Sequence, residues 1–362
     1  MKLVDEFRSP QAVRALSERI LAKDGTWRFM EVCGTHTMAI ARFGLKELLA
    51  GKVRFLSGPG CPVCVTSAHD LDLLIAVAGM PGVVLTTFGD MLRVPGSRTS
   101  LEQARAKGAE VKIIYSPLEA PELAREHRDK QVVMAGVGFE TTAPVVAGTL
   151  QMAVAEGLDN FYVFSAHKVI PPAMEALLRL GEVRVNGFIC PGHVSAIIGT
   201  HPYEPIAGGF GVPCVISGFE PVDVLQTVLM LIEMSEAGRP EVRVQYRRGV
   251  REDGNPKARA VMDAVFELAD AEWRGFGAIP ASGLVLRPEY AAHDALKVFD
   301  PRVESAEEPA GCSCGDVLRG ITEPEDCPLF GSYCTPENPV GPCMVSSEGS
   351  CAAAYRYGGR EQ

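Results

Sequence analysis

Three observations predict an α/β fold with parallel sheets for this sequence of 362 residues. Short runs of β-branched and aromatic residues recur along the chain, and the stretches between them are long enough for helices. Several runs are apolar throughout rather than alternating, which is typical of strands that helices cover on both faces. Hydrophobic residues make up 47% and charged residues 22% of the chain, an ordinary globular composition.

Eight strands are predicted, in two groups of four. The first group comprises Arg28–Val32, Val53–Leu56, Val83–Phe88 and Val111–Tyr115. The second group comprises Val132–Val137, Phe161–Phe164, Gly187–Ile189 and Cys214–Ile216. Corresponding strands lie about 100 residues apart, which predicts two similar α/β domains in tandem that face a central cleft. Chance recurrence in an alternating β/α chain is the competing interpretation.

The residues before the first and after the last predicted strand contain helices and a C-terminal segment that lacks a hydrophobic core of its own. Helices are expected at Ser9–Ala22, Asp223–Glu236 and Asn255–Trp273, and Ala278–Leu286 is a strand or a loop. From Asp300 the chain is rich in Pro, Gly and Cys, so it buries too little apolar surface to fold unaided. The predicted domains are residues 28–129, residues 130–240, and a third, Cys-rich domain made of residues 1–27 and 241–362.

Charge and hydropathy exclude several classes of protein. Asp and Glu total 45 against 35 Lys and Arg, and the net charge of −10 argues against nucleic acid as the main partner. No apolar run reaches about 18 residues and the first residues carry no apolar signal core, so we expect a cytoplasmic location without membrane insertion. Structural disulfides are therefore a poor explanation for the 11 cysteines, and metal binding or redox chemistry is favoured.

Polar motifs follow the predicted strands, where parallel sheets bind ligands. Cys33 and His36 lie in CGTHT after the first strand, where Cys33 is either a core-packing residue or a functional thiolate. A thiolate with a nearby imidazole suits iron, zinc or copper. Cys61 and Cys64 form a CxxC after the second strand, which permits a redox-active disulfide, two metal ligands or an inert pair. His193 in PGHVS is either a buried structural histidine or a functional residue. The sequence contains neither a complete GxGxxG nor a P-loop motif.

The C-terminal cysteines form the densest cluster. Six of them follow the spacing C-x-C-x12-C-x6-C-x8-C-x7-C: Cys312, Cys314, Cys327, Cys334, Cys343 and Cys351. Four thiolates hold an iron–sulfur cluster or a zinc ion, and this spacing matches neither the ferredoxin run nor a zinc ribbon. The two surplus cysteines could form a disulfide beside the metal.

These motifs together resemble the HypD family of hydrogenase-maturation proteins. The resemblance rests on CGTHT, GPGCPVC, GFETT, FSAHK, PGHVSAIIG, GGFGVPCVISGFEP and GPCMVSSEGSCAAAYRY, from about Phe29 to Tyr357. It implies a scaffold, here expected to be a monomer, that assembles the Fe(CN)2CO unit of [NiFe] hydrogenases with a small HypC-type chaperone. The cyanide groups would come from a HypE-type donor, whose carbamoyl-derived thiocyanate is made with HypF.

The resemblance also implies roles for individual residues. The family pattern C-x14-C-x6-C-x16-C selects four ligands of a [4Fe–4S] cluster: Cys312, Cys327, Cys334 and Cys351. Cys314 and Cys343 remain as a redox pair, as in ferredoxin–thioredoxin reductase, and would pass electrons to a second pair, Cys61 and Cys64. Cys33 would bind iron with His36 close by. His193 and Glu348 match family motifs and would line the cleft.

Two alternatives stay open on the sequence. The first is a thiol–disulfide oxidoreductase of the ferredoxin–thioredoxin reductase type that acts on another protein. The second is a binding module with a structural zinc tail. An iron–sulfur chromophore would exclude the zinc module, and CN and CO infrared bands would separate the scaffold from the oxidoreductase.

Overall fold

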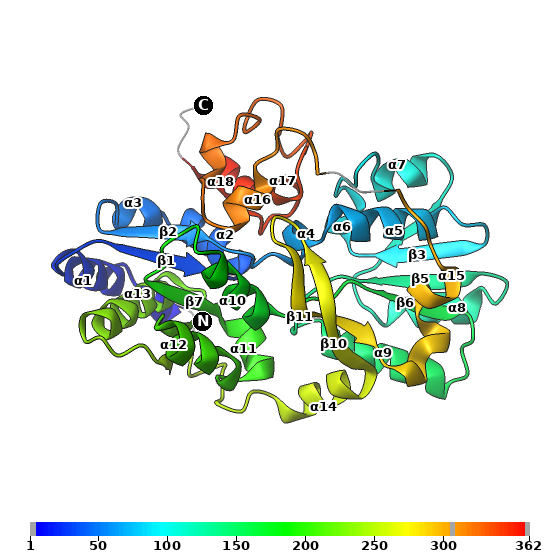
Figure 1. Cartoon of the computed structure of the whole chain (residues 1–362), viewed down its shortest axis with the longest axis horizontal. Helices are drawn as coiled ribbons and strands as arrows, with labels where there is room; N and C mark the ends of the chain where they lie inside the picture. Colours follow the sequence, from blue (N-terminus) through cyan, green and yellow to red (C-terminus); the bar gives the residue numbers. More distant parts are fainter. Residues whose placement is uncertain (1–4, 305–307, 359–362) are drawn as a thin grey trace.

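The computed structural model describes residues 5–304 and 308–358. Within these residues the chain is an α/β protein with two parallel sheets and one antiparallel hairpin. The two sheets lie at opposite ends of the long axis, with the hairpin between them, and the Cys-rich segment lies along one side (Figure 1).

Each parallel sheet has its own strand order. The first sheet has the order β2-β1-β7-β8-β9, with β1 (Trp27–Glu31), β2 (Val53–Ser57), β7 (Gly187–Pro191), β8 (Cys214–Ser217) and β9 (Val242–Val244). The second sheet has the order β4-β3-β5-β6, with β3 (Val83–Thr87), β4 (Glu110–Ile113), β5 (Gln131–Gly136) and β6 (Phe161–Ser165). All pairings in both sheets are parallel, so the carboxyl ends of each sheet's strands meet at one edge.

The eight predicted strands are confirmed, but the tandem arrangement is not. Strands β1 and β2 pair with β7 and β8 from the second predicted domain, while β3 and β4 pair with β5 and β6. The sheets therefore do not divide the chain between residues 129 and 130. From β1 to β9 the chain instead crosses twice between the sheets, once between β2 and β3 and once between β6 and β7. The central cleft stays a prediction.

Helices connect the strands and continue to the C-terminal end. As far as β6 they are η1 (Asp5–Arg8), α1 (Pro10–Leu21), α2 (Gly34–Arg42), α3 (Leu45–Leu48), α4 (Pro62–Val65), α5 (Ala68–Ala78), α6 (Gly89–Leu92), α7 (Leu101–Ala106), α8 (Glu119–Glu126) and α9 (Ala143–Ala155). Beyond β6 they are α10 (Ile170–Leu180), α11 (Gly192–Ile198), η2 (His201–Tyr203), α12 (Glu204–Phe210), α13 (Pro221–Glu236), α14 (Pro256–Val265), η3 (Pro288–His293), α15 (Ala295–Phe299), α16 (Cys314–Leu318), η4 (Pro324–Asp326), α17 (Pro342–Val345) and α18 (Ser350–Tyr357).

Local sequence explains where several of these helices begin. The Ser9 hydroxyl accepts a hydrogen bond from the Ala12 N–H at the start of α1, and Ser67 and Asn255 cap α5 and α14 in the same way. Helix α1 packs against α13, so the N-terminal segment joins the first sheet's layers rather than a separate Cys-rich domain. The two helices predicted at Ser9–Ala22 and Asp223–Glu236 are thereby confirmed.

The helix predicted at Asn255–Trp273 is wrong in its second half. Helix α14 ends at Val265, and the chain continues as β10 (Phe266–Trp273), which pairs antiparallel with β11 (Gly277–Leu286). Phe266 packs into the core of the second sheet, and Trp273 packs into the core that contains the first sheet and the Cys-rich segment. A strand rises about 3.4 Å per residue against about 1.5 Å for a helix, so an extended segment can join the two cores.

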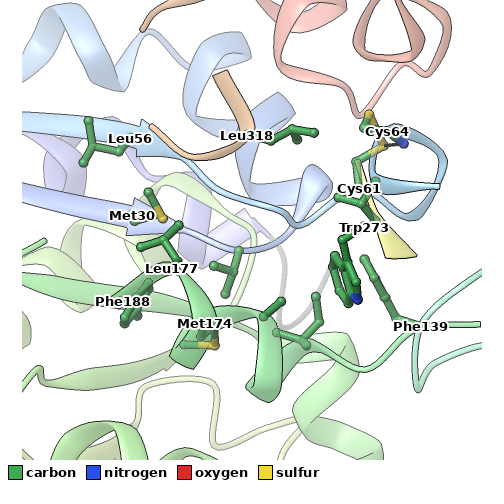
Figure 2. Packing of buried hydrophobic residues seen from close by; sticks show 14 of the residues in the cluster. Met30, Leu56, Cys61, Cys64, Phe139, Met174, Leu177, Phe188, Trp273 and Leu318 are labelled. Carbon is green, nitrogen blue, oxygen red and sulfur yellow. Dashed lines mark hydrogen bonds between the residues drawn. A yellow bond between two sulfur atoms is a disulfide. The ribbon is translucent and has the colours of Figure 1, made fainter. Parts of the chain in front are cut away.

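The largest core joins the first sheet to the cysteines. Met30, Leu56 and Phe188 lie in one buried cluster with Cys61 and Cys64. Figure 2 shows Phe139 and Trp273 in the same cluster, and their rings stack with centroids 6.0 Å apart. The cysteine-bearing loops thus rest on rigid packing rather than on solvent-exposed turns.

Within residues 5–304 and 308–358, none of the helices combines the length and the apolar composition that crossing a lipid bilayer requires.

The substitution Phe188→Ala tests the central position of β7. Phe188 is fully buried, so its truncation should lower the free energy of unfolding by about 3–5 kcal/mol in urea titrations. Leu268→Ala, at a side chain that is 60% exposed, is the matched control and should change stability by about 0.5 kcal/mol or less. Equal effects of the two substitutions would contradict this packing.

Candidate functional site

The site begins at Cys33, directly after β1. Its buried backbone is extended at the N-cap of α2, and its N–H donates to the Glu31 carboxylate at 3.0 Å. The Gly34 N–H donates to the Gly60 carbonyl at 2.9 Å, which joins this loop to the loop that follows β2. A Cβ at Gly60 would overlap the Cys33 backbone nitrogen, so this close approach requires glycine.

The CxxC loop lies against Cys33 and carries a disulfide. Cys61 and Cys64 are bonded, with their Cα atoms 5.2 Å apart, and both are buried. Cys61 caps α4, and its sulfur accepts the Cys64 N–H at 3.3 Å. The two residues thus form a disulfide in the structure, and their redox activity stays a prediction.

An aromatic stack connects the two predicted histidines. The His36 ring packs on Phe219 at 4.6 Å between centroids, and the exposed His193 ring packs on the same phenyl ring at 4.0 Å. His36 Nε2 lies 2.9 Å from the Gly218 carbonyl, which fixes its proton on that nitrogen. Phe219 therefore holds His193 beside the Cys33 loop, although the two histidines come from different strand ends.

Glu348 reaches this group from the Cys-rich segment. Its carboxylate accepts the Thr35 hydroxyl at 2.7 Å, and a Cβ on Gly34 would lie only 2.6 Å from the Glu348 Cβ. The structure thus brings together five of the predicted site residues on three loops and the C-terminal segment: Cys33, His36, Cys61, His193 and Glu348.

Burial sets the protonation of this group at neutral pH. It raises the pKa of the Cys33 thiol to about 12, with further contributions from the Glu348 and Glu31 carboxylates. It lowers the pKa of His36 to about 4. Burial also raises the pKa of Glu31 to about 8. Cys33 is therefore a protonated thiol and His36 a neutral imidazole before any metal binds.

The tail cysteines converge in the same core as the disulfide. The Cys343 thiol is hydrogen-bonded to Cys314 and Cys351, which raises its pKa, while Cys314 and Cys343 together lower the pKa of Cys351 to about 6. Cys312 is hydrogen-bonded to Cys314 as well. The pair predicted for redox exchange, Cys314 and Cys343, therefore belongs to one group of thiols that act on one another's pKa.

The four predicted cluster ligands are thiols, the donors that an iron–sulfur cluster needs, but they are not arranged around a single metal ion. The Cys334 sulfur accepts the Val340 N–H at 3.3 Å, a hydrogen bond of the kind that tunes iron–sulfur ligands. Cys312 and Cys327 are partly buried against the same core. Across the described ranges, no group of three or more His, Cys, Asp or Glu side chains is placed to hold one metal ion. The four-ligand cluster stays a prediction.

Two short helices bring one cysteine of each predicted thiol pair onto neighbouring elements. Helix α17, which carries Cys343, contacts α4, which carries Cys64 (Figure 1). Val63 and Val345 from these helices pack against one apolar cluster.

Two residues near the thiols were missed by sequence reasoning. Phe219 lies in SGFEP, where only the acidic residue stood out. Arg274 is buried beside the disulfide loop, and its Nε donates to the Thr66 carbonyl at 3.1 Å. The turn sequence RGFG at 274–277 was an available signal for a hairpin there, but the predicted helix obscured it.

Other strand-end polar residues have structural partners. Lys168 Nζ is 3% exposed and lies 3.2 Å from the Asp70 carboxylate. His167 Nδ1 lies 3.1 Å from the Ser165 hydroxyl, and burial lowers the pKa of His167 to about 3. Glu220 forms an ion pair with Arg8. These contacts hold loops in place.

The buried carboxyl of Glu140 predicts that the stability of the fold depends on pH. Its carboxyl is 2% exposed and accepts the Ile170 N–H at 3.0 Å, and burial raises its pKa to about 7. The folded state keeps this proton between the unfolded pKa of 4.5 and about 7, so the group's contribution to stability falls as the pH rises through that window.

Glu140→Gln removes this titration. Its free energy of unfolding, relative to that of the original chain, should therefore increase between pH 5 and pH 8 by up to roughly 3 kcal/mol. Urea titrations at four pH values measure the difference, and two curves that stay parallel would show that Glu140 is ionised in the folded protein.

Comparison with known proteins agrees with these motifs. The family model HypD, described as "Hydrogenase formation hypA family", matches residues 10–358. The hydrogenase maturation factor HypD of Azotobacter vinelandii is 48% identical over 100% of this chain and 98% of its own length. HypD2 of Bradyrhizobium diazoefficiens is 46% identical over 99% of this chain and 97% of its own length. HypD of Escherichia coli K12 is 44% identical over 99% of this chain and 98% of its own length.

These matches cover the Cys33 loop, the disulfide loop and the Cys-rich segment alike. They do not favour the alternative of a general thiol–disulfide oxidoreductase. The chain belongs to the HypD family of hydrogenase maturation factors.

Proposed function

We propose that this chain is the scaffold on which the Fe(CN)2CO unit of [NiFe] hydrogenases is assembled, together with a HypC-type chaperone and a HypE-type cyanide donor. One observation carries the proposal. The Cys33 loop touches the disulfide loop through Gly60, and the disulfide helix α4 touches α17 of the Cys-rich segment. The proposed metal ligand Cys33, the Cys61–Cys64 disulfide and the thiols of the Cys-rich segment therefore lie on elements that contact one another.

Iron is the substrate in this proposal, and Cys33 is its ligand. A thiolate is a soft donor that suits an electron-rich iron bearing cyanide and carbon monoxide. Because burial raises the pKa of Cys33 to about 12, the thiol loses its proton only when a metal competes for the sulfur. Neutral His36 and the Glu348 carboxylate lie beside it as further polar groups.

A [4Fe–4S] cluster is the proposed resident cofactor, with Cys312, Cys327, Cys334 and Cys351 as its ligands. The buried thiols and the N–H···S bond at Cys334 support this donor set. When bound, the cluster would supply single electrons to the neighbouring thiols.

The proposed work of the thiol pairs is a disulfide exchange within the chain. One thiolate of the Cys314/Cys343 pair attacks the Cys61–Cys64 disulfide, and the second thiolate then resolves the mixed disulfide. The Cys314/Cys343 pair loses two electrons and two protons, and the Cys61/Cys64 pair gains both. Contact between α17 and α4 favours this direct route.

The reduced Cys61/Cys64 pair then serves cyanide transfer. Two electrons cleave the S–C bond of a thiocyanate, R–S–CN, into a thiolate and cyanide, while Cys61 and Cys64 return to a disulfide and release two protons. Their loop contacts the Cys33 backbone, so cyanide is released next to the iron ligand. The buried surroundings limit the access of water.

Cys33→Ala tests the iron ligand. Protein isolated anaerobically with its small chaperone partner should show CN and CO stretching bands in the infrared, and this variant should lose them because the soft ligand is gone. Cys190→Ala, at a buried cysteine on β7, is the matched control and should keep the bands. Bands that persist in Cys33→Ala would exclude Cys33 as the ligand.

Cys61→Ser and Cys64→Ser test the relay. Both should abolish maturation of hydrogenase in cells, since no disulfide can form, yet leave the cluster's visible absorption and its iron content of about four per chain unchanged. Iron and sulfide analysis of the purified variants provides the second readout. A loss of the cluster in these variants would contradict the proposal that Cys61 and Cys64 act in electron transfer and do not hold the cluster.

A further inference from the structure

A cavity of about 510 Å³ lies where the start of α10, helix α14 and the β10–β11 hairpin meet. Its wall is largely apolar: Val169 precedes α10, Met262 lies on α14, and Phe266 and Leu284 lie on the two strands of the hairpin. Cavities of roughly 300–1,000 Å³ with such walls are typical of small-molecule sites. The proposed function assigns no role to these residues.

The apolar wall of this cavity reaches the solvent. Leu268 on β10 lines the cavity and is 60% exposed, whereas Met262 and Phe266 beside it are buried. A ligand with an apolar body can therefore enter along this side and cover surface that water now touches.

The wall also contains a buried carboxyl group with an unused hydrogen-bonding atom. Glu140 lines the cavity and is 2% exposed, and its Oε1 accepts the Ile170 N–H at 3.0 Å. Its Oε2 is buried without a hydrogen-bond partner among the described residues. A buried acceptor without a partner is unfavourable, so a ligand that brings a donor to this wall gains an interaction that the chain itself leaves unmade.

The charges along the cavity favour a cation over an anion. Three carboxyl groups line it, those of Glu140, Asp263 and Glu267, against the two guanidinium groups of Arg259 and Arg287. Arg287 lies 3.8 Å from the Glu267 carboxylate, and its Nε donates to the Asp263 carbonyl at 2.7 Å. This cation therefore has partners at the cavity edge, and the carboxyl without one is the buried group.

We propose that this cavity binds a small primary amine with an unbranched apolar chain, whose ammonium group donates to Glu140 Oε2 while the chain packs against Met262 and Phe266. An ammonium group has three donors and no acceptor, which matches an unpaired carboxylate oxygen. A hydrogen bond between two charged groups is stronger than one from an alcohol, and a ligand carboxylate would repel Glu140. The inference does not depend on the cysteines or on the proposed function.

Glu140 can supply the negative charge at pH 8. Burial raises its pKa to about 7, so at pH 8 the larger part of this carboxyl is ionised. An alkyl ammonium group keeps its proton at this pH, as the lysine side chain does with a pKa of about 10.4. The binding measurements are therefore made at pH 8.

The experiment compares matched probes on the full chain by isothermal titration calorimetry. Hexylamine should bind about tenfold more tightly than hexanol, which has the same chain without the charge, and hexanoate should bind more weakly than either. Butylamine should bind about tenfold more weakly than hexylamine, because it buries two fewer CH2 groups. Equal affinities of hexylamine and hexanol, or no binding of hexylamine, would overturn the proposal.

Three variants locate the binding. Glu140→Gln removes the charge and should lower the affinity for hexylamine about tenfold, to the level of hexanol. Glu156→Gln is the matched control, because it removes an equal charge from a surface pair with Arg125 and should leave the affinity unchanged. Leu268→Trp enlarges an exposed side chain at the cavity edge, so it should weaken hexylamine and hexanol alike.

The exposed position of Leu268 keeps the test decisive when Glu140→Gln does not fold. Unchanged hexylamine binding in either Glu140→Gln or Leu268→Trp would show that the amine binds elsewhere on the chain and would overturn the assignment of this cavity. An equal loss of affinity in Glu156→Gln would reduce the effect to net charge and would overturn it as well.

Discussion

The site depends on one set of backbone contacts, those that the β10–β11 hairpin makes with both segments that cross between the sheets. Trp273 pairs with Thr66 on the first crossing, and Gly283 pairs with Lys168 on the second. The ion pair of Lys168 with Asp70 joins the two crossings to each other at a nearly fully buried position. Because the hairpin enters the cores of both sheets, it also fixes the sheets relative to the loops that carry the thiols.

Within this frame, the site is dominated by sulfur and by neutral groups. Cys33 and His36 are buried, and burial keeps both side chains uncharged at neutral pH. The Glu348 carboxylate reaches the Cys33 loop through the Thr35 hydroxyl, whereas the buried Arg274 side chain lies at the hairpin tip, where its Nε donates to the Thr66 carbonyl.

Local patterns in the sequence predicted the strands but not their partners. Val83–Thr87 is buried at every position, and such uniform apolar runs identify strands directly. Nothing in the spacing of the runs distinguishes a neighbour along the chain from one in the other half, so β1 and β2 were grouped with β3 and β4 instead of with β7 and β8. Strand-end motifs singled out Cys33 and His36, because polar residues there are unusual, whereas Glu348 was predicted only from the resemblance of its motif to the HypD family. Phe219 and Arg274 look like ordinary core and turn residues, and only the folded chain brings them to the sulfurs.

The double crossing has a consequence for the order in which the protein forms during synthesis. The four strands of the second sheet come from contiguous chain and can pair early, although the core of that sheet also needs Phe266 and Leu284 from the later hairpin. Strand β1 can pair early with β2, but its other partner, β7, comes from far downstream: the Arg28 N–H donates to Asn186, 158 residues later. The Cys33 loop can therefore meet the Gly60 loop early, but its contact with Glu348 can form only after almost the entire chain has left the ribosome. Topology thereby delays the completion of this group of residues until the Cys-rich segment has been made.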